Sequence, residues 1–297
     1  MSDRRCSPIV LFFLLVLTCS HAISQGIPVH GNGLDVDLNG VLYVLDSDHS
    51  MLRQYSPEGK LIRELGGAGW QNDQFDHPEG IWAHNGVDVF VADYGNHRIQ
   101  RFDKNLAFIS TFFTRDNSNP DERFGYPSSV SVSRLGELFI CDTENSRIVK
   151  VGNSNTVEKT FGGFGAGMGN LRKPSIVACG PNDEVCVLDP PRVMVYDAFG
   201  NFLGELFEGG FTQPRGLSAD QQSIAVLDSG SVMIFDGAHR LVQRLVLPVT
   251  DGHMEQSECV SLSREHIYVL SPSGLSVYPN PRYRESQPRL EKEQDSH

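Results

Sequence analysis

The sequence lacks several patterns that mark catalytic and metal-binding proteins. It has no Cys-x-x-Cys pair and no cluster of cysteines and histidines, so no structural zinc site is expected. Gly-x-Ser-x-Gly is absent, which removes the strand–turn–helix that exposes a hydrolase serine. No run after residue 22 is apolar enough to span a bilayer. Glycine and proline, by contrast, are plentiful, with 29 and 16 residues, and they favour many turns.

Basic residues are also too few for a protein that binds nucleic acid. The chain has 25 Lys and Arg against 37 Asp and Glu, which gives a net charge of −12 at pH 7. Such a surface repels a phosphate backbone. No nucleic-acid partner is therefore expected.

The first 22 residues have the pattern of a targeting segment. Two arginines precede the apolar run Ile9–Thr18, and small residues stand at the cleavage positions Ser20 and Ala22. The apolar run is too short to cross a bilayer. We expect a signal peptide cleaved after Ala22 and a secreted protein, extracellular or periplasmic; a lipoprotein signal at Cys19 is the alternative.

The stretch Pro78–Phe102 predicts paired strands. Two apolar runs flank Asn85-Gly86, which is the strongest short hairpin signal. The predicted strands of this antiparallel unit are Gly80–Ala83, Val87–Ala92, Arg98–Phe102 and Leu106–Thr114.

The same unit recurs along the chain. A proline stands fifteen residues before an aspartate at Pro78 and Asp93, Pro127 and Asp142, and Pro174 and Asp189, and fourteen before it at Pro214 and Asp228. The first copy has Gly31 before Asp46, and the last has Ser271 in the aspartate position. Successive anchors are spaced by 47, 49, 47, 39 and 43 residues, which is the period of a propeller blade. The sequence therefore predicts an all-β fold, a six-bladed β-propeller of four-stranded antiparallel blades.

The run Asp93–Phe102, DYGNHRIQRF, resembles the signature of the NHL-repeat family, and Asp142–Val151, DTENSRIVKV, is a second copy. The resemblance covers about residues 31–278 and implies the same six-bladed propeller. We expect one propeller domain over residues 23–278 and a polar, disordered tail over residues 279–297. Blade six ends at its third strand, so we expect Ile23–Val29 to close the ring as its outer strand.

One aspartate ends the second strand of each of five blades: Asp46, Asp93, Asp142, Asp189 and Asp228. Repetition once per blade indicates a structural anchor rather than a calcium ring or a catalytic pair. We expect each carboxylate to accept hydrogen bonds from the backbone amides of the next turn.

Cys179 and Cys186 lie on neighbouring strands across the turn Gly180–Glu184. We expect their side chains to share a face, so that a disulfide is compatible with an exported protein. Two buried thiols are the alternative.

Propeller ligands usually sit at the axial mouth, among loops that lead into the innermost strands. The residues around each repeat proline are therefore candidate ligand-binding residues: His30, His77, Tyr126, Lys173 and Gln213 before it, and Asn32, Glu79, Ser128, Ser175 and Arg215 after it. This set differs in charge from blade to blade, as a binding surface does. The sequence favours a non-enzymatic binding module for a protein, a peptide or a glycan.

The resemblance also raises an enzymatic alternative. The peptidyl-α-hydroxyglycine α-amidating lyases are similar in fold and hold zinc with histidines directly after the proline in three blades. Here those positions hold Glu79, Ser128, Ser175 and Arg215, so neither a metal nor another cofactor is expected. His30 and His77 lie just ahead of these positions and leave a displaced metal site open. A lyase-like or lactonase-like metal-dependent enzyme is therefore the alternative.

Overall fold

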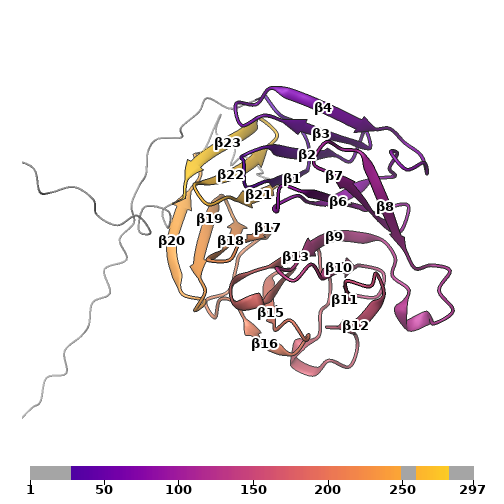
Figure 1. Ribbon diagram of the computed structural model, residues 1–297. Coiled ribbons are helices and arrows are strands. Elements are labelled where there is room, and N and C mark those ends of the chain that lie inside the picture. The colour runs from indigo at the N-terminus through magenta and orange to yellow at the C-terminus, as the bar shows by residue number, and fades with distance from the viewer. Residues whose placement is uncertain (1–27, 249–258, 281–297) are drawn as a thin grey trace, which may run out of the picture.

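The computed structural model describes residues 28–248 and 259–280, which form a ring of six antiparallel sheets (Figure 1). Within each sheet the strands follow the chain order from the innermost strand outward. Among the described residues, five sheets have four strands and the last has three. The predicted six-bladed all-β propeller is confirmed.

The first three blades consist of β1 (Gly33–Val36), β2 (Leu42–Asp46), β3 (Met51–Tyr55) and β4 (Leu61–Gly66); β5 (Pro78–Trp82), β6 (Asp88–Asp93), β7 (Arg98–Asp103) and β8 (Phe108–Phe113); and β9 (Pro127–Val132), β10 (Leu138–Asp142), β11 (Arg147–Val151) and β12 (Val157–Phe161). The last three consist of β13 (Ile176–Cys179), β14 (Val185–Asp189), β15 (Arg192–Tyr196) and β16 (Phe202–Glu205); β17 (Pro214–Ala219), β18 (Ser223–Asp228), β19 (Ser231–Asp236) and β20 (Leu241–Val246); and β21 (Cys259–Leu262), β22 (His266–Ser271) and β23 (Gly274–Pro279). In the described ranges, three short 3-10 helices lie in connections: Pro120–Glu122, Gly167–Gly169 and Pro181–Asp183.

The strand register explains the constant spacing of proline and aspartate. Pro78 pairs with Asp93 across β5 and β6, and the corresponding pairs are Pro127 with Asp142 and Pro214 with Asp228. The Asn85-Gly86 hairpin is present, but five residues separate its strands instead of the three that the predicted strand bounds leave. The Asn85 side chain accepts hydrogen bonds from the Val87 and Asp88 amides, and Gly86 has a φ of 68°.

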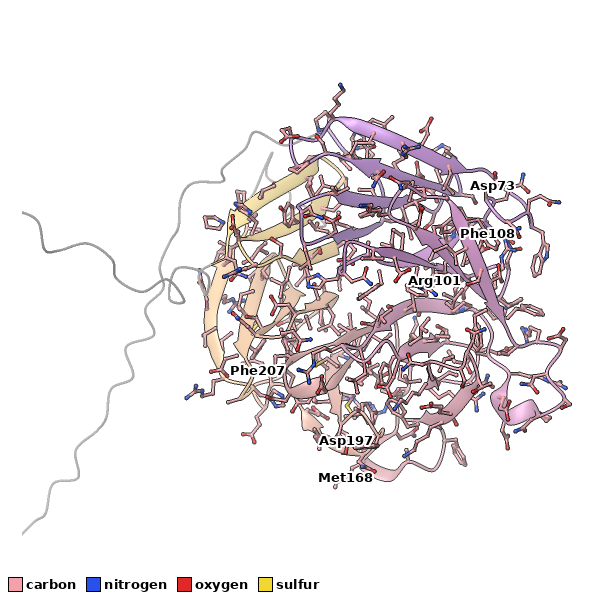
Figure 2. The ribbon with its side chains drawn as sticks, viewed as in Figure 1. Asp73, Arg101, Phe108, Met168, Asp197 and Phe207 are labelled. Carbon is pink, nitrogen blue, oxygen red and sulfur yellow. The ribbon has the colours of Figure 1, made fainter. Side chains whose placement is uncertain are left out.

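The hydrophobic core lies mainly between neighbouring blades. Leu45 and Leu52 of blade one pack with Val91 and Phe102 of blade two, and all four are fully buried. Burying each such side chain contributes about 1.5–3 kcal/mol. Outer strands and connections are more exposed, and Asp73 and Met168 lie at the outer edge of the ring (Figure 2). Stability therefore depends on contact between blades.

Side-chain oxygens on the innermost strands join four of the six pairs of neighbouring blades in the described chain. Asp35 accepts a hydrogen bond from the Ala83 amide at 2.7 Å, and Ser131 and Ser218 accept the equivalent bonds from Cys179 and Leu262, each at 3.0 Å. The carboxylate of Asp35 also accepts one from the Ser261 hydroxyl at 2.9 Å. This last bond links blade six to blade one and helps to close the ring.

Residues 23–27 of the predicted closing strand lie outside the described residues. Val29, at the end of that segment, is fully buried, in a cluster with Leu34 of blade one and with Leu270 and Leu275 of blade six. Pairing of the N-terminal segment with β23 therefore remains a prediction.

The repeated aspartates are structural anchors, but most hold a different segment from the one predicted. Asp93 accepts a hydrogen bond from the Asp76 amide at 2.7 Å, and Asp142 accepts one from the Gly125 amide at 3.1 Å. These amides belong to the connection that leads into the blade and not to the next turn. Asp189 and Asp228 make the same contact with Lys173 and Gln213, both at 2.6 Å.

A buried arginine strengthens the anchor in blade two. Arg98 Nε lies 2.7 Å from the Asp93 carboxylate, and both side chains are almost fully buried. The same guanidinium donates to the carbonyls of Trp70, Gln71 and Gln74 at 2.9–3.0 Å. The ion pair therefore fixes the whole connection between blades one and two. Arg147 and Arg192 pair with Asp142 and Asp189 in the same way.

The disulfide between Cys179 and Cys186 does not form. Cys186 pairs with Ala178, and Cys179 pairs with Val185. The two cysteines are thus one residue out of register, and their side chains point to opposite faces of the sheet. Cys186 packs with blade five and Cys179 with the blade-three side. Both are free thiols, and burial raises the pKa of Cys179 to about 12.

We predict that Asp93→Ala lowers the free energy of unfolding by about 3–5 kcal/mol, because it leaves the buried Arg98 charge without its partner. Asp46→Ala is the matched control, since Asp46 pairs with the exposed His49 and the partly exposed Arg53. The control loss should be at most about 1 kcal/mol. Urea denaturation of both variants measures the difference, and equal losses would contradict the anchor role.

Candidate functional site

A cavity of about 390 Å³ lies on the axis of the ring. Its walls come from the innermost strands of all six blades, β1, β5, β9, β13, β17 and β21. The axial mouth is defined here as the end where these strands begin, formed by Asn32, His77, Glu79, Ser128, Ser175 and Arg215. A cavity of this size, with a few polar groups directed into it, is typical of a ligand site.

The structure brings together only part of the predicted set. Each residue directly after a repeat proline lines the cavity, because it is at the start of an innermost strand. His77 also lines it, whereas four residues from before the proline do not: His30, Tyr126, Lys173 and Gln213. His77 and Tyr126 both have φ of 48°, a left-handed conformation that is uncommon for residues other than glycine.

Glu79 and Arg215 are the two charged groups that face each other across the mouth. They come from blades two and five, which are opposite in a ring of six. Within the described residues neither side chain has an ion-pair partner. Desolvation by burial raises the pKa of the Glu79 carboxyl above its ordinary value of 4.5. The nearby His77 side chain partly opposes this shift. The mouth therefore offers a negative and a positive group to a ligand.

The polar residues between these charges are mostly occupied by structural contacts. The Asn32 side chain accepts from the Ser47 amide and hydroxyl at 3.0 and 2.9 Å. Ser128 donates to the Ser175 carbonyl at 2.8 Å and accepts from the Thr143 hydroxyl at 3.0 Å. These bonds hold the rim in place. Glu79 and Arg215 are then the charged side chains of the rim that are free to contact a ligand.

Sequence reasoning missed the residues that directly follow the anchor aspartates. Ser47 lines the cavity, and Thr143 bonds to Ser128 at its rim. Tyr94 occupies the same repeat position, and its ring lies 5.1 Å from that of Tyr126, centroid to centroid. Ser47, Tyr94 and Thr143 each directly follow the anchor aspartate of their repeat. This constant position in the sequence could have identified them.

Tyr126 lies outside the cavity, beside His97. Its backbone N–H donates to His97 Nδ1 at 3.0 Å, and the two rings meet edge to face at 4.2 Å. Burial and the neighbouring Arg115 lower the pKa of His97. Tyr94, Tyr126 and His97 thus form an aromatic group outside the cavity.

Across residues 28–248 and 259–280, no three His, Cys, Asp or Glu side chains are placed to share a metal ion. His77 is instead bonded to Asp76, with Nδ1 2.6 Å from the carboxylate. The displaced metal site suggested by His30 and His77 has no ligand set in the described chain. The absence of a cofactor remains a prediction.

In the same described ranges, no helix has the length and apolar character needed to traverse a bilayer.

Comparisons with known proteins place the chain among repeat propellers. The NHL repeat family matches residues 75–102 and 124–151, in blades two and three. Protein brain tumor of Drosophila melanogaster is 30% identical over 159 residues, which cover 50% of this chain and 15% of that protein. NHL repeat-containing protein 3 of Homo sapiens is 25% identical over 105 residues, which cover 33% of this chain and 30% of that protein. The matches thus span less than a third of either curated relative.

Among solved structures, a streptogramin B lyase aligns with a TM-score of 0.58 at 12% sequence identity, over 83% of this chain and 78% of that one. At this identity the likeness concerns the fold alone. The chain thus contains NHL repeats in blades two and three, and its six blades form a β-propeller.

Proposed function

We propose that the protein is an exported, non-enzymatic binding module that holds a protein or peptide partner at the axial mouth. One observation carries this proposal: Glu79 and Arg215 face the same cavity from opposite blades and are not paired with each other or with another charged residue of the described chain. Unpaired charges that converge on a cavity are ready to contact charged groups of a ligand.

The chemistry of the mouth selects a partner with charges of both signs. Glu79, with His77 beside it, would contact a lysine, an arginine or a terminal amine, and Arg215 would contact a carboxylate. A peptide segment commonly carries both groups. The net charge of −12 opposes binding of a nucleic acid, which presents phosphates alone.

Two further parts of the proposal follow from the sequence. Residues 1–22 have the pattern of a signal peptide, with cleavage after Ala22, so the partner would be met outside the cytoplasm, in an extracellular or periplasmic space. The rigid ring holds many loops on one face, which suits recognition of a protein surface.

We predict that the triple variant His77→Ala, Glu79→Ala, Arg215→Ala loses binding to peptides selected from a random-peptide phage library on the wild-type chain. Each charged contact removed should cost about 1.5–3 kcal/mol of binding free energy. A matched control removes Glu58, Lys60 and Arg63, three exposed charged residues at the outer edge of blade one. Selected peptides that bind the triple variant as tightly as the wild type would refute the axial site. Stoichiometric zinc in the purified protein would favour the metal-dependent enzyme instead.

We also predict that binding of a selected cationic peptide weakens as the pH falls through the raised pKa of Glu79. Because that pKa lies above the ordinary 4.5, the loss should begin at a higher pH than for an exposed glutamate. Protonation removes the negative charge, so affinity rises with pH across this range. Calorimetric titration at several pH values measures it, and Glu79→Gln should abolish the dependence. An unchanged pH profile in Glu79→Gln would show that another group binds the cation.

A further inference from the structure

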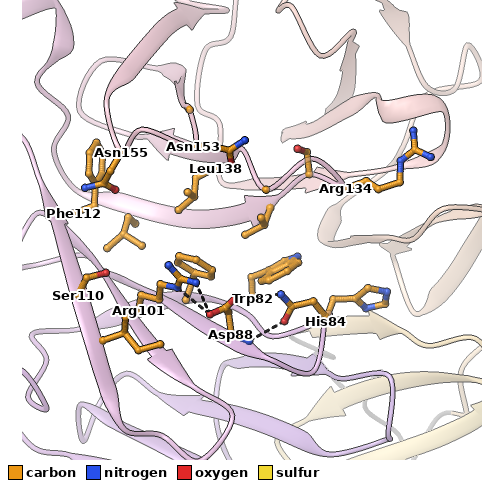
Figure 3. Close-up of a pocket in the computed structure, with 18 of the residues that line it drawn as sticks. Trp82, His84, Asp88, Arg101, Ser110, Phe112, Arg134, Leu138, Asn153 and Asn155 are labelled. Atoms are coloured by element: carbon orange, nitrogen blue, oxygen red, sulfur yellow. Dashed lines mark hydrogen bonds and ion pairs between the residues drawn. The ribbon is translucent and has the colours of Figure 1, made fainter.

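A second and larger cavity, of about 840 Å³, lies between blades two and three. Its rim includes Asn85, Gly136 and Asn153, which belong to turns at the end of the molecule opposite the axial mouth. We call this cavity the inter-blade groove (Figure 3). Trp82 and His84 line both this groove and the axial cavity, so the two spaces adjoin at these residues.

The floor of the groove is apolar and rich in aromatic rings. It includes Trp82, Phe90, Phe112 and Leu138. The Trp82 and Phe90 rings are 5.9 Å apart, centroid to centroid, and are tilted by 58° rather than stacked. The partly exposed indole therefore presents an apolar surface along one wall (Figure 3). Ile109, at the outer side, is 47% exposed.

The charged side chains in the groove are neutralised by the protein itself. Arg101 lies 2.8 Å from the Asp88 carboxylate, and its guanidinium also covers the Phe90 ring at 5.5 Å. Arg134 lies 2.8 Å from Asp183 of blade four. The three Asp and Arg residues of the lining are thus all paired, in contrast to Glu79 and Arg215 at the axial mouth. No Asp or Arg side chain that lines the groove is therefore left unpaired to bind a charged ligand.

Several neutral polar groups are, by contrast, available. Ser110 and Asn155 are exposed at one end of the groove beside Phe112, and their side chains make no hydrogen bond within the described chain (Figure 3). The Asn153 amide group donates to the Leu135 carbonyl at 3.2 Å, which leaves its carbonyl oxygen able to accept. Hydroxyl and amide groups can both donate to and accept from the hydroxyls of a ligand.

We infer that the inter-blade groove binds a neutral saccharide. The partly exposed Trp82 indole offers an apolar surface to the C–H face of a sugar ring, and hydroxyl and amide side chains bond to its hydroxyls. The paired charges favour a neutral ligand over an ionic one. This site is separate from the axial mouth and does not depend on the function proposed for it.

The sequence contains only two tryptophans, which makes the groove open to a direct optical test. Trp70 is 54% exposed in a connection between blades, and Trp82 is in the groove. In the full-length chain, Trp70→Phe leaves Trp82 as the sole tryptophan. This variant is first screened on an array of neutral oligosaccharides, and each bound saccharide is then titrated while the Trp82 fluorescence is recorded.

We expect a saturable change in Trp82 fluorescence and a loss of affinity of about tenfold or more when Ser110→Ala and Asn155→Ala remove two hydrogen-bonding groups. The matched control, Asn72→Ala with Ser118→Ala, changes exposed residues of the same types outside the groove and should leave binding intact. Glu79→Gln with Arg215→Gln should also leave it intact, which separates this site from the axial mouth.

Three results would overturn the inference. The first is that no neutral saccharide on the array binds. The second is that the Ser110 and Asn155 double variant binds as tightly as its control. The third is that random peptides selected on the chain, rather than saccharides, lose binding in that double variant, which would assign the groove to a peptide.

Discussion

The architecture depends on a buried carboxylate at the end of the second strand of a blade. In blades two to five this carboxylate accepts hydrogen bonds from the backbone of the connection that enters the blade. A buried carboxylate is costly unless its oxygens are bonded, so the anchor also forces the connection into one conformation. The residue after the connection then begins the innermost strand at a fixed place. This is how one repeated interaction positions Glu79 and Arg215 at the axial mouth.

The fold was predictable because its determinants are local and repeated. A proline about fifteen residues before an aspartate specifies a pairing of the first two strands, and the structure shows that pairing for Pro78 and Asp93. The cysteine pair shows the limit of such reasoning. The register of β13 and β14 places Cys179 opposite Val185, and a register difference of one residue reverses the face of a side chain. The turn Gly180–Glu184 expected from the sequence already leaves Cys179 opposite Val185, so the expectation of a shared face was wrong.

Of the candidate residues predicted from the sequence, those attached to the repeat frame are the ones that line the axial cavity. The position after each proline pointed to Glu79 and Arg215, which line the axial cavity. Tyr126 was assigned to the same ring but lies outside the cavity, where its ring packs against those of His97 and Tyr94. The inter-blade groove could not be predicted, since it arises where side chains of two different blades meet. Its charged residues are paired elsewhere, Asp88 with Arg101 within blade two and Arg134 with Asp183 of blade four.

Amide hydrogen exchange tests the anchor most directly. If the carboxylates hold the connections, the amides of Asp76, Gly125, Lys173 and Gln213 should exchange as slowly as those of the central strands, although all four lie outside strands. Exchange of these amides at the rate of the exposed hairpin loops would contradict the account. The carboxylates would then not hold the connections that position the residues of the axial mouth.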